Sequence, residues 1–132
     1  MLNTTIWAPR VLAILRIVTA LLFLEHATMK FLQFPAPIPG MNYPLPAIVL
    51  VAGAIEVITG TLIAIGFYTR VAAFIASGEM AAAYFMGHAP QGFWPALNMG
   101  EPAIFFCFIF LYLAVAGAGA WALDNARRPS LA

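Results

Sequence analysis

The chain has 132 residues, of which 64% are hydrophobic and only 8% are charged, and its mean hydropathy is +0.94. So few charges cannot cover the surface of a water-soluble domain, and the composition therefore predicts a membrane protein. A formal net charge of +1 argues against nucleic acid as a partner. With one cysteine, the chain has neither an internal disulfide nor a redox-active pair of its own cysteines.

Four apolar runs follow one another along the chain, and each is long enough to cross a membrane at about 20 residues per crossing. Little sequence remains outside these runs, so we expect a single membrane domain over residues 1–132. The first run is too long for the apolar region of a signal peptide, and we interpret it as a retained span. The predicted fold is an all-α, four-transmembrane-helix antiparallel bundle. Its helices are expected at about 11–33, 46–66, 70–88 and 101–121.

The connections between these runs carry helix-breaking residues. Prolines interrupt the chain between 34 and 44, where they remove backbone donors. Gly66 is placed to end the second helix before a tight turn. The third connection, 89–100, is rich in proline and glycine, and the spacing of Asn98 and Glu101 predicts a capping box for the last helix.

Basic residues predict the orientation of this bundle. With four spans, both termini and the turn after Gly66 lie on one side of the membrane. Positively charged residues concentrate on the cytoplasmic side of membrane proteins, so we expect cytoplasmic N- and C-termini. Lys30 then lies at the outer side, together with aromatic residues of the connecting loops that suit a membrane interface. The basic residues on the expected cytoplasmic side are Arg10, Arg16, Arg70, Arg127 and Arg128.

Three carboxylates, Glu25, Glu56 and Glu79, interrupt segments that are otherwise apolar. An ionisable group at the centre of a transmembrane helix costs about 2.5–3.5 kcal/mol on insertion scales, so such groups normally face one another or a wet cavity. Glu56 and Glu79 are the middle residues of their runs and are expected near the bilayer midplane. Gly53 and Gly60 share the face of Glu56 and predict that another helix approaches it closely.

A polar pocket in the outer half of the bundle is the functional hypothesis, with Glu56 at its floor. His26 and Lys30 are four residues apart and share a helix face. A carboxylate and a histidine together can exchange protons with a bound quinone or thiol. The candidate ligand- or proton-binding residues are Glu25, His26, Lys30, Glu56, Glu79, His88 and Glu101.

A structural interpretation stands beside this one. Each carboxylate could instead neutralise a cation or bond a neighbouring helix, and a capping box alone explains Glu101. Arg16 and Arg70 are expected to set topology by extending to the cytoplasmic interface, or to form ion pairs. No spacing typical of a zinc site occurs, so no metal is predicted.

Several motifs together resemble the DoxX family of small four-helix bacterial membrane proteins, over nearly the whole chain. The family often has glycine where this chain has Ala27 and Met99, and neither difference removes a titratable group. The motifs that carry the resemblance are Leu15-Arg16, His26-x-x-x-Lys30, Glu56-x-x-x-Gly60, Gly66-Phe-Tyr-Thr-Arg70, His88-Ala-Pro-Gln-Gly-Phe-Trp-Pro95, Asn98-Met-Gly-Glu101, Gly117-Ala-Gly119 and Trp121-Ala-Leu-Asp124.

The resemblance implies a multi-pass protein of the bacterial inner membrane that is associated with redox chemistry. Relatives in this family include a subunit of an archaeal thiosulfate:quinone oxidoreductase and a member of a mycobacterial complex that handles oxidative stress. We therefore expect a subunit of an oxidoreductase complex that binds a quinone-like or other small amphipathic ligand, with a soluble or membrane redox partner. The alternative is a non-catalytic scaffold, or a carrier of protons or small solutes. Enzymatic activity and a homo-oligomeric state both stay open.

Overall fold

The computed structural model describes residues 3–127, and Arg128, one of the basic residues used to predict orientation, lies outside them. Every regular element in the described part of the chain is helical, which confirms the all-α prediction. The elements are α1 (Thr4–Leu32), α2 (Ala47–Ile65), α3 (Thr69–Ala83), the π-helical turn η1 (Tyr84–His88), the 3₁₀ turn η2 (Ala89–Gln91), α4 (Pro95–Asn98), α5 (Glu101–Ala116) and α6 (Leu123–Ala126).

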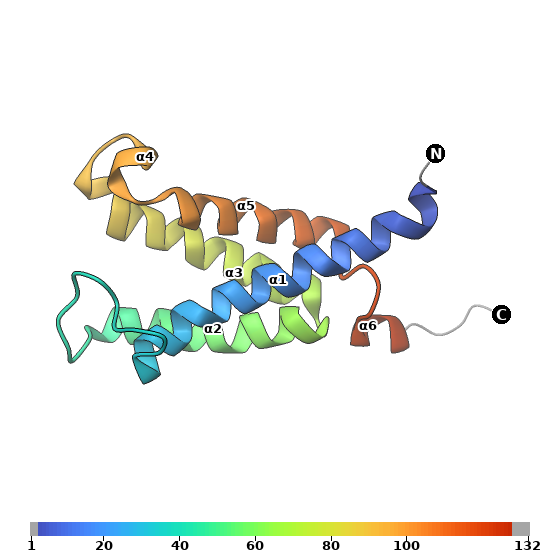
Figure 1. Cartoon of the computed structure of the whole chain (residues 1–132), viewed down its shortest axis with the longest axis horizontal. Coiled ribbons are helices and arrows are strands. Elements are labelled where there is room, and N and C mark those ends of the chain that lie inside the picture. The colour runs from blue at the N-terminus through green and yellow to red at the C-terminus, as the bar shows by residue number, and fades with distance from the viewer. Residues whose placement is uncertain (1–2, 128–132) are drawn as a thin grey trace.

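The four long helices pack as two antiparallel pairs that share a core. Helix α1 packs along α2, α3 packs along α5, and α2 packs against α3 (Figure 1). The start of α1, the α2–α3 turn and residues 117–127 lie together, and we call this the terminal end. The connections 33–46 and 89–100 lie at the opposite end, which we call the loop end.

Helices α1 and α2 are long and apolar enough to cross a membrane, as judged by length and composition within the described residues. Helix α5 is apolar but has 16 residues, or about 24 Å at 1.5 Å per residue. Helix α3 continues into the π-helical turn η1, so the third apolar run forms one helical rod that reaches His88. The structure thus contains helices in all four predicted regions.

Two predicted boundaries are wrong. Helix α1 begins at Thr4, earlier than the predicted start at 11. The last helix ends at Ala116 rather than near 121, because Gly117 adopts φ 88° and ψ −165°. That geometry turns the chain away from the helix, and such a positive φ favours glycine. The N–H of Gly117 still bonds to the Leu113 carbonyl at 2.8 Å, which caps the helix end.

Gly66 ends α2 as predicted. It adopts a left-handed conformation, with φ 70° and ψ 43°, and its N–H bonds to the Ile63 carbonyl. The next N–H, of Phe67, reaches back to the Leu62 carbonyl at 2.9 Å, so two otherwise unpaired carbonyls at the end of α2 are satisfied.

The predicted capping box at the start of α5 is not formed. Asn98 is the last residue of α4, and its Oδ1 accepts a hydrogen bond from the Gly100 N–H at 2.8 Å. Gly100 occupies the N-cap position, and Glu101 is the first residue of the helix. Asn98 is used instead to hold the loop, since its amide also donates to the Gly92 carbonyl at 2.9 Å.

The core between the helix pairs is built from small and aromatic side chains. Phe23 of α1 is fully buried and meets the ring of Phe110 edge-on, with 4.7 Å between centroids. Phe106 stacks on Phe110 and also contacts Phe23. On α3, Ala73 and Ala76 are fully buried and allow α5 to approach closely. The polar groups described below lie on either side of this aromatic core along α1.

Candidate functional site

Lys30 and Glu56 form an ion pair between α1 and α2. Lys30 Nζ lies 2.7 Å from Glu56 Oε1 and 2.7 Å from Oε2, so one ammonium bonds to both carboxylate oxygens. The Glu56 side chain is 1% exposed and that of Lys30 12% exposed. Breaking such a pair would leave an uncompensated buried charge, which makes both partners structurally important.

Glu79, on α3, is the third member of this group. It is half-buried and lies close enough to Glu56 and Lys30 for its charge to interact with both. Its Oε2 is buried and has no hydrogen-bond partner among residues 3–127. Since Lys30 and Glu56 already neutralise one another, Glu79 adds a carboxyl group that has no cation of its own in this cluster. We call Lys30, Glu56 and Glu79 the acid cluster.

Glycines on α2 bring α1 close enough for the Lys30–Glu56 pair to form. A Cβ at Gly53 would lie 2.8 Å from the Phe31 ring and 3.0 Å from Lys30 Cδ. A Cβ at Gly60 would lie 2.9 Å from the Leu24 side chain. Both approaches are closer than real Cβ contacts allow, so the absence of a side chain sets the spacing of the two helices.

Glu25 and His26 lie on an accessible face of α1 rather than inside the bundle. The His26 ring meets Phe106 of α5 edge-on, with 5.6 Å between centroids. His26 is also near enough to Lys30 and Glu25 to interact with their charges. These two residues are therefore neighbours of the acid cluster on the surface of α1.

His88 and Glu101 belong to the loop-end structure and make no hydrogen bond to the acid cluster within the described residues. His88 Nδ1 lies 3.0 Å from the Asn98 carbonyl oxygen, and its ring stacks on Tyr84. Glu101 is exposed at the start of α5. Side-chain hydrogen bonds in the described residues join only Lys30 and Glu56 of the seven candidates, so the predicted single pocket is not seen as a connected polar site.

Arg16 is buried, and the interpretation that it extends to the interface is wrong. It is 0% exposed and donates five hydrogen bonds, all to backbone carbonyls. Two go to the end of α2, at Ile63 (2.8 Å) and Ala64 (2.6 Å). The other three hold the segment after α5. Their acceptors are Ala118, Ala120 and Trp121.

Arg70 also binds backbone rather than a carboxylate. Its Nη1 donates to the carbonyls of Ala114 (3.1 Å) and Val115 at the end of α5. The guanidinium lies over Gly117, where a Cβ would sit 3.0 Å from Nη2. The ion-pair alternative for Arg16 and Arg70 therefore fails within the described residues, and both arginines satisfy carbonyls at helix ends.

Asp124 is a residue that the site predictions missed. Its Oδ1 accepts from the Tyr68 N–H at 2.8 Å, and its Oδ2 accepts from the Thr69 N–H at 3.0 Å, so it caps the start of α3 from 55 residues away. Partial burial opposes ionisation of this carboxyl, but the bonds from Thr69 and Tyr68 and the charge of Arg127 outweigh it and lower its pKa. The backbone N–H of Asp124 also bonds to the Gly66 carbonyl at 2.8 Å.

The motif Trp121-Ala-Leu-Asp124 is the only sequence signal that pointed to this residue. No periodic pattern could find it, because its partners are backbone groups of a distant turn. Arg16, Arg70 and Asp124 thus form one structural network at the terminal end, and several of the sequence motifs contribute residues to it. These residues are Arg16, Gly66, Arg70, Gly117, Gly119 and Asp124.

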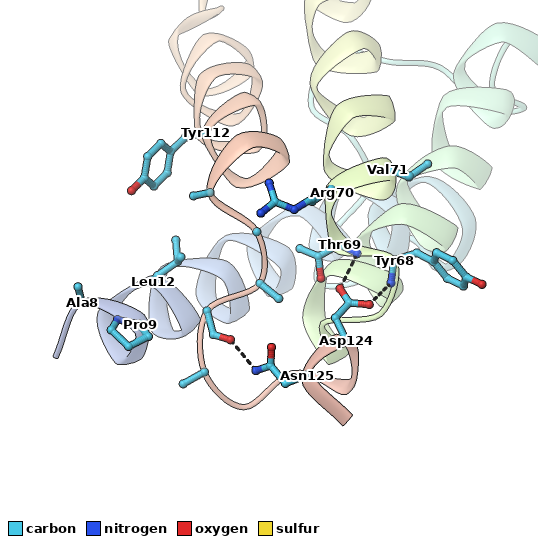
Figure 2. Close-up of a pocket in the computed structure, with 15 residues that line it drawn as sticks. Ala8, Pro9, Leu12, Tyr68, Thr69, Arg70, Val71, Tyr112, Asp124 and Asn125 are labelled. Carbon is cyan, nitrogen blue, oxygen red and sulfur yellow. Dashed lines mark hydrogen bonds between the residues drawn. The ribbon is translucent and has the colours of Figure 1, made fainter. Parts of the chain in front are cut away.

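An open cavity of about 840 Å³ lies at this terminal end rather than at the loop end, where the polar pocket is predicted. Figure 2 shows the Arg70 guanidinium between α5 and the segment that follows it, with Asp124 bonded to Tyr68 and Thr69 nearby. The start of α1 forms another wall, at Pro9 and Leu12. The acid cluster is thus not part of this cavity.

Comparison with known proteins gives a family and no assigned activity. The family model described as DoxX matches residues 11–89, which is more than half of the chain. An uncharacterized protein of Haemophilus influenzae is 47% identical over 127 residues, which cover 93% of this chain and 95% of that protein. No solved structure matches.

Proposed function

The chain belongs to the DoxX family of membrane proteins, and we propose that it is a redox-associated subunit whose acid cluster exchanges a proton with a small amphipathic ligand, of the quinone type. The observation that supports this proposal is the arrangement of Lys30, Glu56 and Glu79 on three different helices. One carboxylate is fully paired, and the other has a buried oxygen without a partner in the described residues.

The proton chemistry follows from the charges. Lys30 and Glu56 neutralise one another, so a second ionised carboxylate beside them would be an unpaired charge in an apolar surrounding. We propose that Glu79 holds the exchangeable proton. It would give this proton to a ligand that gains electrons and take it back when the ligand is oxidised. The electrons would come from a partner protein, since the chain's one cysteine allows no dithiol of its own.

Access to the cluster would lie along α1. His26 is accessible and interacts with the charge of Lys30, one helical turn further along the same face. Histidine changes protonation readily in the physiological range, which suits a group that passes protons between the surface and a buried acid. Four membrane crossings, cytoplasmic termini and an inner-membrane location complete the proposal, with α3–η1 and α5 as the third and fourth spans.

Quinone content is the direct test. The protein is purified in a mild detergent, and bound quinone is extracted and measured by mass spectrometry, for the unmodified chain and for Glu79→Gln. Glu25→Gln is the matched control, since it changes an accessible carboxylate on the neighbouring face. We expect bound quinone in the unmodified chain and the control.

Infrared difference spectra on reduction of added decylubiquinone then report the proton. A carboxyl signal that appears in the unmodified chain and is absent from Glu79→Gln supports the proposal. A protein that binds no quinone, or a signal that persists in Glu79→Gln, contradicts it.

A non-catalytic scaffold, or a carrier of protons or small solutes, is the second candidate, and one observation favours the scaffold. Every hydrogen bond that Arg16 makes goes to the protein's own backbone, so a buried charge in this bundle can be wholly structural. On this hypothesis Glu56→Gln and His26→Ala change stability but leave cells unaffected. Co-purification of a redox partner with the unmodified chain would argue against it.

A further inference from the structure

We propose that the terminal end carries a binding site for an anionic phospholipid, with the phosphate beside Arg70 and an acyl chain in the groove between α3 and α5. This inference is independent of the acid cluster. It rests on two adjoining cavities that meet at one arginine.

The first cavity, of about 840 Å³, opens at the terminal end and has a mixed lining, in which Arg70, Asp124 and Asn125 lie among apolar residues. The second, of about 420 Å³, is an almost wholly apolar groove between α3 and α5. Arg70 and Val71 line both. A cation at the boundary between a cavity of mixed lining and an apolar groove matches the chemistry of an amphiphile that has an anionic head.

The apolar groove runs along the helix axes. Phe74 lies one turn beyond Arg70 on α3, and Leu111 lies one turn before Val115 on α5. Phe74 is 66% exposed and Val115 is 73% exposed, so the described residues leave these side chains open to whatever surrounds the bundle. In a membrane that surrounding is lipid, and an acyl chain lying parallel to the helices fits between them.

The guanidinium of Arg70 has donors to spare for a phosphate. Its bonds to the described residues all use Nη1, at the Ala114 and Val115 carbonyls. These bonds fix the guanidinium at the end of α5. Gly117 has no side chain to cover it, since a Cβ there would lie 3.0 Å from Nη2 and 3.5 Å from Nε. Arginine prefers phosphate because its donors form a planar fork.

One acidic group, Asp124, also lines the first cavity and would repel an anion. Its charge is already engaged by the N–H groups of Tyr68 and Thr69 and interacts with that of Arg127. Arg127 stacks over the Tyr68 ring, 4.4 Å from its centroid, and so adds a second positive charge at the same end. Basic residues at helix ends near a membrane surface are a general feature of sites for anionic lipids.

Native mass spectrometry of the delipidated full-length protein tests the proposal. Phosphatidylglycerol and phosphatidylcholine with identical acyl chains are titrated separately. Both lipids present a phosphate to Arg70, but the trimethylammonium group of phosphatidylcholine is repelled by the arginine and makes that lipid neutral overall. We therefore expect phosphatidylglycerol to bind about tenfold more tightly, and Arg70→Gln to remove this preference together with the charge-assisted bond to phosphate. Arg10→Gln is the matched control: Arg10 belongs to the same end of the molecule but contacts Trp7 and does not line the cavity.

Val115→Trp tests the groove while it keeps Arg70. We expect this substitution to weaken both lipids, whereas Val18→Trp, on an exposed position of α1, leaves binding unchanged. Equal binding of the two lipids, or an equal loss in Arg10→Gln, overturns the proposal. Displacement of the lipid by an equal concentration of glycerol phosphate shows a site for free phosphate instead. Unchanged binding in Val115→Trp shows that no acyl chain occupies the groove. Melting temperatures of the variants identify any that fail to fold.

Discussion

Replacing Arg16 with methionine should destabilise the protein more than any other change of an arginine among the described residues. Methionine keeps much of the length and apolar volume of the side chain but donates no hydrogen bond. The substitution removes one hydrogen bond from each of five backbone carbonyls, and these bonds join the end of α2 to the segment after α5. The effect should therefore reach both elements.

The size of the effect follows from which carbonyls are buried. The bonds to Ala118 and Ile63, both 2.8 Å long, are buried, and the other three are partly buried. The Ile63 carbonyl keeps its bond from the Gly66 N–H, so Ala118 is the one buried carbonyl that is left without a donor among the described residues. An acceptor left unsatisfied costs about 1–3 kcal/mol, and the bond that Ile63 loses contributes about 1 kcal/mol. Water can reach the partly buried carbonyls and replace much of what they lose. We expect a loss of about 3 kcal/mol in the free energy of unfolding.

The assay is unfolding in mixed micelles with increasing sodium dodecyl sulfate, followed by tryptophan fluorescence. Amide hydrogen exchange over residues 117–125 gives the local readout, and it should become faster in Arg16→Met. Arg16→Lys should fall between the two, because a single ammonium cannot replace the five bonds. Arg10→Met is the matched control: Arg10 is exposed on the same helix, so its loss should cost no more than about 0.5 kcal/mol. The reasoning is refuted if Arg16→Met costs less than about 1 kcal/mol, or if Arg10→Met costs as much.

Three further predictions test the rest of the structure. Asp124→Asn should cost about 1 kcal/mol, because the amide accepts through Oδ1 alone and keeps only one of the two capping bonds. The pKa of Asp124 is lowered in the folded state, so the contribution of its charge is present above about pH 3.9 and is lost as the pH falls through the lower folded value. Acid titration of stability should lose this component in the variant. Gly53→Ala should cost about 1–3 kcal/mol in the same unfolding assay, because the new Cβ forces α1 and α2 apart. Gly78→Ala is its control and should be neutral or slightly stabilising, since a Cβ there meets nothing within 4 Å. Equal effects of the two substitutions would contradict the close packing of α1 on α2. Lys30→Met alone should cost about 3–5 kcal/mol of unfolding free energy, because it leaves the buried Glu56 carboxylate without a partner. Adding Glu56→Met should restore most of this stability. A double variant as unstable as the single one would show that the ion pair itself stabilises the bundle.

The helical elements were predictable because their signals are local. The apolar runs have the length of membrane spans, and Gly66 ends α2 where a glycine can take the left-handed conformation. The end of α5 was predicted too late, because the run of apolar and small residues continues past Ala116 while the backbone turns at Gly117. The composition of that run does not show at which of its glycines the backbone leaves the helix, because contacts with neighbouring elements decide this.

The candidate site was predictable in part. The cost of a charge in an apolar segment picked out Glu56 and Glu79 from their own runs alone, and both lie in the acid cluster. Which cation pairs with which carboxylate depends on how α1 is rotated and shifted against α2, and Gly53 and Gly60 set that contact. His88 and Glu101 were grouped with the acid cluster because all of them were expected in the outer half of the bundle. Residues at the same end of a bundle need not be in contact, because their side chains can point in different directions.

The sequence by itself determined that this is an all-helical protein with charges inside apolar segments, because hydropathy and helix-ending residues act over a few positions. Only the tertiary structure decided what those charges do. Arg16 bonds to carbonyls 47 to 105 residues away in the chain, and Asp124 caps a helix that begins 55 residues earlier. Backbone carbonyls and N–H groups occur at every residue and leave no mark in the sequence, so the partner of a buried charge becomes visible only when the helices are packed.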